Sequence, residues 1–260
     1  MKKFCFTVDD NIRFFKEIIE RGYGSIFEHP YLNMYKRLHE KYGLKVQLNL
    51  FYEMKDFCLS QMTDKYKEEW RINSDWLKLS FHSRLENAYP YQYSGYDEVY
   101  TDCKNVHNEI LRFAAAESLG KTTTVHCCRA TDDGLRALKD NGVLGLLGLY
   151  GNEIKPRSSY QSTPEEGDRI RLGDVVYTDG VAYAGIDIIL NLFSKEEILS
   201  QLDTQRARDF VKIMIHEQYF YPDYKNYQED FEEKISAAFA FLKKNGFESV
   251  FFEEQIREEL

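Results

Sequence analysis

The stretch FCFTVDDN, residues 4–11, decides the fold because it joins a strand signal to a pair of acids. Alternating apolar side chains in its first half predict a strand over residues 2–9. Asp9 and Asp10 then follow at the carboxyl end of this strand, directly before a helical pattern over residues 12–21. A single polar residue would be enough to cap that helix. In α/β proteins this end of a strand carries chemistry, so the second acid suggests a functional site.

The strand-then-helix alternation continues along the chain. The predicted strands lie at 45–53, 77–83, 122–128, 143–151 and 210–220, and the predicted helices at 30–42, 54–76, 96–120, 131–142, 195–209 and 227–246. Residues 152–193 interrupt the alternation, and we expect short strands there; 247–256 reads as a strand or a strand followed by a helix. Alternating units imply a mostly parallel sheet. We therefore expect an α/β fold, a distorted or incomplete (β/α) barrel formed by one domain over residues 1–260, with an open doubly wound sheet as the alternative.

Composition and charge exclude several classes of partner. The formal net charge of −9 argues against nucleic acid and anionic membrane surfaces, because phosphate binding needs a basic face. No apolar run approaches the roughly 20 residues of a membrane span, and we expect no export signal in the first residues, because their apolar run is shorter than such a signal needs. We expect a cytoplasmic protein. The odd cysteine count agrees with reduced thiols, and we expect the adjacent Cys127 and Cys128 to be small core residues.

Three of the six histidines fall at or near the ends of predicted strands. These are His82, His126 and His216, and in a parallel sheet their strand ends meet Asp9 and Asp10 at one rim. Aspartate and histidine ligands with an open position suit a divalent metal, most simply zinc. The other three histidines lack this context, and we expect them on the surface: His29, His39 and His107.

Three short motifs, in this order, resemble those of the polysaccharide deacetylase (NodB-homology) superfamily of carbohydrate esterases. TVDDN (7–11) is similar to the family's TFDDG motif, with Asn11 in place of the glycine. HSRLE (82–86) is similar to H[ST]xxH, and IMIHEQ (213–218) to LxIHD. The family has a distorted (β/α) barrel, and the resemblance covers most of the chain.

The resemblance implies a role for each matched residue. Asp9 would be the general base, Asp10 and His82 metal ligands, and His216 the general acid. Arg129 matches the family's catalytic arginine loosely. In the family's reaction a metal polarises an acyl carbonyl and binds the attacking water.

The third metal ligand is open at this point. Glu86 stands where the family has its second histidine, and a carboxylate can bind zinc. His126 could complete the site instead, or metal binding could have been lost.

Two further residues are candidates for substrate binding. Asp187 interrupts an apolar alternation. It either orients the catalytic base or Arg129, or it is a polar residue at a bend whose hydrogen bonds are satisfied locally. Tyr219 opens one of two aromatic clusters, 89–96 and 219–224, which follow the strands of His82 and His216 and suit either sugar stacking or loop packing.

Together these features predict a metal-dependent hydrolase that acts on a small amide or N-acylated sugar. One rival is a metal-free retaining glycosidase with two carboxylates, such as Asp9 and Glu217. The other is a non-catalytic carbohydrate-binding barrel. The sequence indicates neither the substrate nor the oligomeric state.

Overall fold

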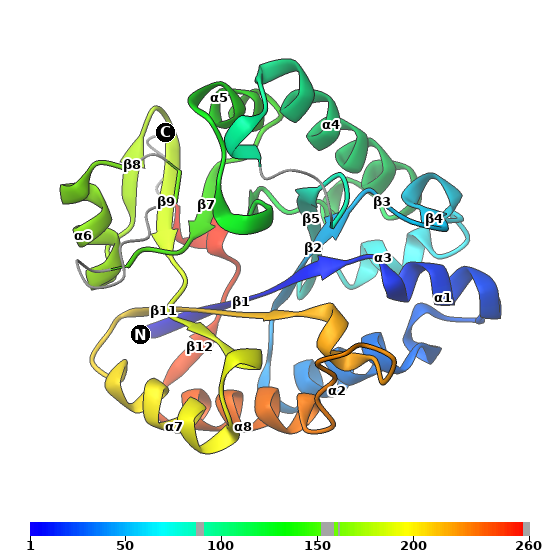
Figure 1. Ribbon diagram of the computed structural model, residues 1–260. Helices are drawn as coiled ribbons and strands as arrows, with labels where there is room; N and C mark the ends of the chain where they lie inside the picture. Colours follow the sequence, from blue (N-terminus) through cyan, green and yellow to red (C-terminus); the bar gives the residue numbers. More distant parts are fainter. Residues whose placement is uncertain (87–90, 152–158, 161, 257–260) are drawn as a thin grey trace.

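A ring of short parallel strands forms the centre of the protein (Figure 1). The computed structural model describes residues 1–86, 91–151, 159–160 and 162–256. In the first sheet the strands run in the order β10 (Ile188–Ile189), β11 (Phe210–His216), β1 (Lys2–Asn11), β2 (Val46–Phe51) and β5 (Leu77–Ser83), and β12 (Phe247–Ser249) pairs with the start of β1. In the second sheet they run β6 (Thr122–Thr123), β7 (Gly145–Gly148), β9 (Val181–Gly185) and β8 (Val176–Thr178). Every pairing in these two sheets is parallel except β8 with β9.

The two sheets join into a distorted barrel, as the sequence predicts. On one side the Ser80 hydroxyl of β5 donates to the carbonyl of Thr122 in β6 over 2.7 Å. On the other side the chain passes directly from β9 into β10. In that passage the Ile186 amide donates to the carbonyl of Gly148 in β7, and the Asp187 amide donates to the carbonyl of Lys212 in β11, both over 2.8 Å. Where the strand ladders are interrupted, side-chain hydrogen bonds and single backbone hydrogen bonds therefore join the two sheets.

Helices surround this ring on the outside (Figure 1). They are α1 (Arg13–Arg21), α2 (Pro30–Tyr42), α3 (Lys67–Ile72), α4 (Tyr96–Phe113), α5 (Asp132–Asp140), α6 (Pro164–Leu172), α7 (Lys195–Thr204) and α8 (Phe231–Lys244). Phe239 of α8 packs against Phe4 and Phe6 of β1, with ring centroids 5.4 and 5.0 Å apart, which anchors that helix on the central strand. Among the described residues, no helix has both the length and the apolar character that crossing a membrane requires.

Several predicted elements are wrong in type or extent. The strand expected at 122–128 stops at Thr123, and His126–Cys128 form a short 3₁₀ helix in which Cys127 and Cys128 adopt left-handed backbone angles. The predicted helix 54–76 is α3 preceded by a hairpin of β3 (Glu53–Met54) and β4 (Phe57–Cys58). Helix α6 lies where only strands were expected. Cys127 is exposed, whereas Cys128 is buried as predicted.

The prediction that three histidines lie on the surface is wrong for two of them. His29 is completely buried, because its Nδ1 caps α2 at the Tyr31 amide and its Nε2 faces Glu17 at 3.0 Å. His107 lies on the buried face of α4, next to Cys103 one turn earlier. His39 is partly buried.

Candidate metal centre and active site

A bulge at the end of β1 directs both adjacent acids into the protein interior. The register of β1 against β2 shifts between Val8 and Asn11, and Asp10 has a left-handed φ of 64°. Such bulges re-aim side chains that would otherwise point to opposite faces of a strand. Asp9 is 2% and Asp10 8% exposed, so both carboxylates are buried in the same region. The bulge at the end of β1 therefore brings the two adjacent carboxylates, Asp9 and Asp10, into one site.

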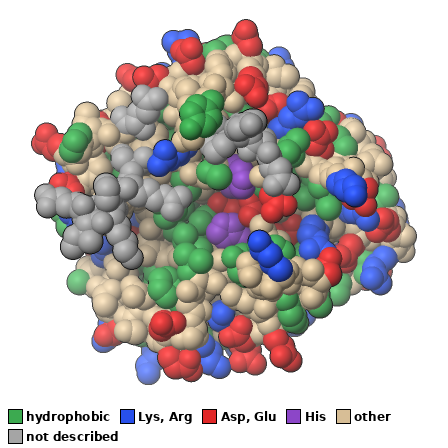
Figure 2. Space-filling model, viewed as in Figure 1, with side chains coloured by type: hydrophobic (Ala, Val, Ile, Leu, Met, Phe, Trp, Pro, Cys, Tyr) green, Lys and Arg blue, Asp and Glu red, His purple; other side chains and the backbone are tan. Residues whose placement is uncertain are grey.

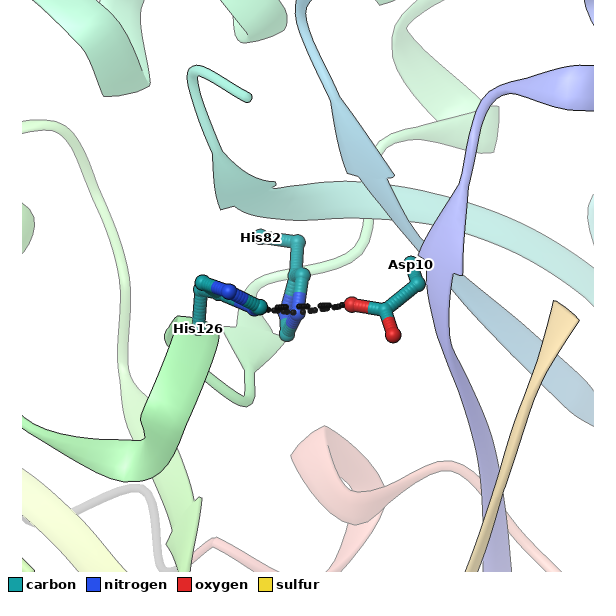
Figure 3. A group of neighbouring side chains, drawn as sticks. All are labelled: Asp10, His82 and His126. Carbon is teal, nitrogen blue, oxygen red and sulfur yellow. Dashed lines mark hydrogen bonds and ion pairs between the residues drawn. The ribbon is translucent and has the colours of Figure 1, made fainter. Parts of the chain in front are cut away.

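Asp10 lies against two histidines from separate elements (Figure 3). Its Oδ1 is 3.0 Å from Nε2 of His82 at the end of β5, and 3.4 Å from Nδ1 of His126. The two imidazole nitrogens are 3.2 Å apart. Three potential ligand atoms thus form a nearly equilateral triangle at the mouth of the barrel.

This donor set fits a divalent metal. Bond lengths of about 2.0–2.1 Å in a tetrahedral zinc site place neighbouring ligand atoms roughly 3.3 Å apart, close to the three separations found here. The second nitrogen of His82, Nδ1, donates to the carbonyl of Thr124 over 2.5 Å, so in the neutral imidazole Nε2 offers its lone pair toward the triangle. The Phe51 ring packs against both histidines, at 5.2 and 5.3 Å between centroids. The Thr124 carbonyl therefore fixes the orientation of the His82 ring, and the Phe51 ring gives the site an apolar border.

The charges of the centre are strongly coupled. Burial by itself raises the pKa of Asp10, but the hydrogen bonds from His126 and His82 outweigh it and hold that pKa well below its ordinary value. Burial lowers the pKa of His82, but the charges of Asp9 and Asp10 outweigh this effect and raise it. The surroundings of Asp10 thus favour its negative charge, and a metal bound there would supply a positive counter-charge.

Asp9 is held beside the triangle by a relay of amide side chains. Asn49 of β2 donates to Asp9 Oδ1 over 2.7 Å, and Gln47 donates to Asn49 over 2.8 Å. Burial raises the pKa of Asp9, and the nearby His82 and His216 oppose that rise. This relay was not predicted, although the polar residues at alternate positions of the otherwise apolar strand KVQLNLF are a readable signal.

His216 faces Asp9 across the sheet, because the two residues are paired in the register of β11 and β1. Its Nδ1 lies 2.9 Å from Oδ1 of Asn191, which also accepts the His216 backbone amide. Since an amide oxygen can only accept, Nδ1 carries the proton and Nε2 is left for a substrate. Asn191 was not predicted either. Tyr219 lies next to His216, with ring centroids 6.1 Å apart.

Comparison with solved structures places this arrangement on a known fold. The Bc1960 peptidoglycan N-acetylglucosamine deacetylase matches with a TM-score of 0.56 and 10% identity, over 99% of this chain and 90% of that one. The acetyl xylan esterase from Clostridium thermocellum, in complex with a cobalt ion, matches with a TM-score of 0.52 and 12% identity, over 97% and 89%. This chain has the polysaccharide deacetylase fold. A 4-alpha-glucanotransferase from Thermococcus litoralis is also similar, with a TM-score of 0.59 and 12% identity, over 97% of this chain but 40% of that protein.

The sequence itself is distant from described families. No family model matches it, and no curated protein is similar enough to count as a relative. The deacetylase fold is therefore established by structural similarity and not by sequence similarity.

The deacetylase fold brings together some of the predicted site residues and separates others. His126 belongs to the triangle with Asp10 and His82, whereas Glu86 is exposed and lies on the wall of a neighbouring cleft. Arg129 is exposed and donates to Gln92 over 2.9 Å.

Asp187 lies apart from the centre. It pairs with Arg208 at 2.5 Å and with the buried Lys212 at 3.1 Å. These contacts satisfy its carboxylate within the barrel wall.

A cleft of about 880 Å³ opens beside Asp10. Figure 2 shows histidine and acidic side chains gathered in a hollow near the centre of this face. One part of the wall is apolar and includes Ile12, Phe51, Met54, Leu85 and Tyr224; the rest is charged and includes Arg13, Lys16, Glu53, Lys55 and Glu86. Two of the charged lining residues, Lys16 of α1 and Asp56 of the β3–β4 hairpin, pair at 3.4 Å. Residues 89 and 90, the first two of the predicted aromatic cluster 89–96, lie outside the described residues.

Proposed function

We propose that the protein is a metal-dependent hydrolase that removes an acyl group from an N-acylated sugar or a similar small amide. The observation that carries this proposal is the triangle of Asp10, His82 and His126, whose ligand atoms lie 3.0–3.4 Å apart beside a buried carboxylate and an open cleft. The fold shared with a deacetylase and an acetyl esterase supports it.

Asp10, His82 and His126 would hold the metal, which we propose to be zinc. A divalent cation bound there polarises an acyl carbonyl and acidifies water. His126 is our choice for the third ligand because its Nδ1 already faces the other two ligand atoms, and Glu86 is then left to contact substrate in the cleft.

Asp9 and His216 supply the two proton transfers. Asp9, held by Asn49, accepts the proton of the attacking water, and a nearby divalent charge favours its ionised form. In its imidazolium form His216 keeps the Nδ1 proton hydrogen-bonded to Asn191 and donates the Nε2 proton to the leaving nitrogen, which leaves a neutral imidazole. The two residues are paired across β1 and β11, so they can act on one substrate held at the mouth of the barrel.

The cleft supports a substrate of small size. A volume of about 880 Å³ falls within the range of roughly 300–1,000 Å³ usual for small-ligand pockets. Its apolar surface at Phe51 and Tyr224 suits the face of a sugar ring, and its charged wall suits hydroxyl and amide groups. A small substrate agrees with the predicted cytoplasmic location, which stays a prediction.

The glycosidase alternative is weakened by Glu217. Its side chain is completely buried, and its carboxylate accepts hydrogen bonds from backbone amides and from Tyr221. An acid or nucleophile in a retaining glycosidase must reach the glycosidic bond. Glu217 lacks that access.

The test begins with metal analysis of the purified protein and of His82→Ala. We expect about one equivalent of metal in the wild type and loss in the variant. A panel of N-acetylated sugars and small amides is then assayed before chelation, after it, and after zinc is returned. Hydrolysis that disappears with chelation and returns with zinc supports the proposal. A wild-type protein that neither retains nor binds zinc contradicts it.

A further inference from the structure

Glu217 forms a contact that the proposed mechanism does not use. It follows His216 at the end of β11, and its side chain is completely buried. Oε2 accepts from the backbone amides of Ile12 and Arg13 at 2.7 and 3.1 Å. Oε1 accepts from the amide of Phe14 at 2.9 Å and from the hydroxyl of Tyr221 at 2.9 Å. Four donors therefore converge on one carboxylate.

Three of these donors belong to the start of α1. Backbone amides in the first turn of a helix have no partner within the helix, and a negative charge there is favoured by the helix dipole. Ile12, at the cap position, has an aliphatic side chain that cannot accept a hydrogen bond. The acceptor comes instead from the residue that directly follows β11, 205 residues away in sequence. Glu217 thereby connects β11 to the segment that follows β1.

The segment that Glu217 holds begins two residues after Asp10. Asp10 has a left-handed φ of 64°, a conformation that is uncommon outside glycine and that surrounding contacts help to hold. On one side, Asn11 is fixed through its amide to the carbonyl of Val8 at 2.6 Å and through its oxygen to the Tyr31 hydroxyl at 2.8 Å. On the other side, the three amides after the turn are fixed by Glu217.

We infer that Glu217 is a positioning residue that holds the Asp10 turn at the correct distance from His82 and His126, so that it sets metal affinity without touching the metal. Because Glu217 also follows His216 directly, the same contact fixes the general acid relative to the metal ligand. The inference rests on the proposed function, since it assigns a role to Glu217 in that same centre.

A carboxylate is the group that this position requires. Every partner of Glu217 is a donor, and an ionised carboxylate is an acceptor at both oxygens. Glutamine would keep the size but would turn an NH₂ group toward one pair of donors. Burial raises the pKa of Glu217 to about 7, and the amide and hydroxyl hydrogen bonds oppose that rise.

The experiment compares zinc affinity and thermal midpoint in four proteins: wild type, Glu217→Gln, Tyr221→Phe and Leu242→Ala. Loss of an outer contact to a metal site typically costs 10–100-fold in affinity, and we expect a loss of about that size in Glu217→Gln. Tyr221→Phe keeps the three amide contacts, so its affinity should fall less. Leu242→Ala removes a buried side chain of α8 and should lower the midpoint while leaving zinc affinity unchanged.

The outcomes separate this inference from the proposed function. If wild type binds zinc and Glu217→Gln binds it equally well, the positioning role is overturned and the proposed function stands. If the wild type does not bind zinc, the proposed function is overturned, and this inference with it. An equal affinity loss in Leu242→Ala would also overturn the role, because general destabilisation would then explain the effect.

A measurement on the wild type covers the case in which Glu217→Gln does not fold. Hydrogen exchange at the amides of Ile12, Arg13 and Phe14 is followed with and without zinc. We expect zinc to slow exchange at these three amides, because fixing Asp10 stabilises the turn that they follow. Exchange that stays the same while zinc demonstrably binds overturns the inference.

Discussion

The barrel contains two buried clusters built around an aspartate, and their surroundings are opposite. The side chains of Asp10 and Asp187 are equally buried, at 7% exposure each. Asp187 faces two cations, Arg208 and Lys212, and also accepts the backbone amide of Lys212. Asp10 faces two histidines, whose nitrogens point toward it and toward each other.

The difference shows how a structural acid can be distinguished from a ligand. At Asp187, permanent positive charges supply the counter-charge, so the cluster is complete as it stands. At Asp10, the partners are imidazoles, which lose their charge on deprotonation and then offer lone pairs, so a bound cation can supply the counter-charge in their place. Burial and residue type are alike in the two places, and the identity of the partners decides the role.

The largest expected effect is at the ligands of the first cluster. Asp10→Ala and His82→Ala should each abolish metal retention and reduce turnover about 10⁴-fold or more, because a Lewis acid contributes several kcal/mol and each 1.4 kcal/mol is tenfold. Metal analysis and steady-state rates measure both effects, and circular dichroism should show an intact fold. Full metal occupancy in either variant would contradict the assignment.

The next effect is at the two proton-transfer residues. Asp9→Asn and His216→Ala should each lower turnover by roughly 10²–10⁴-fold, the usual range for a lost acid or base. Metal content should stay close to normal, which separates these residues from the ligands. If a substrate is found and both variants hydrolyse it at the wild-type rate, the assigned roles are wrong.

A matched pair of variants tests the third ligand. His126→Ala should weaken zinc binding by more than about 100-fold, beyond the loss typical of an outer contact. Glu86→Gln keeps the size of an exposed side chain and should leave zinc affinity nearly unchanged. Isothermal titration with zinc measures both. A larger loss of zinc affinity in Glu86→Gln than in His126→Ala would make Glu86 the ligand. Unchanged affinity in both variants would leave a weak two-ligand site.

The smallest effect on the metal is expected at Asp187. Asp187→Ala leaves the buried Lys212 ammonium without its carboxylate, and breaking a buried pair in this way costs about 3–5 kcal/mol of stability. Denaturant unfolding measures that loss, and zinc affinity measured on the folded protein should not change. Loss of zinc binding without loss of stability would remove the distinction between the two clusters.

The fold was predictable where local signals agreed with the tertiary structure. Strand 77–83 and helix 30–42 have the predicted bounds, since both carry clear periodicity and Gly43 ends the helix with a φ of 71°. The strand at 122–128 was overestimated because nothing in TTTVHCC indicates the left-handed angles at Cys127 and Cys128. His29 was placed on the surface because its partner Glu17 comes from another helix, which sequence periodicity does not reveal.

The site was predictable in its residue types and less so in its connections. Asp10 and His82 follow from strand ends and from the resemblance to deacetylases. The choice between Glu86 and His126 depends on where a loop turns after β6, which is a tertiary question. The roles of Asn49, Asn191 and Glu217 depend on contacts across strands. That residues 1–260 form one catalytic domain remains a prediction.

The left-handed backbone at Asp10 also limits which amino acids evolution or a library can place there. Asparagine and glycine adopt that conformation readily, but neither supplies a negative charge. Glutamate supplies the charge, but it is longer by a methylene and does not share aspartate's tolerance of this region. Several amino acids meet either the backbone requirement or the charge requirement, but aspartate meets both. Position 10 therefore tolerates no other amino acid without a loss of charge or of backbone fit. Asp10→Asn is the substitution that removes the charge while disturbing the backbone least.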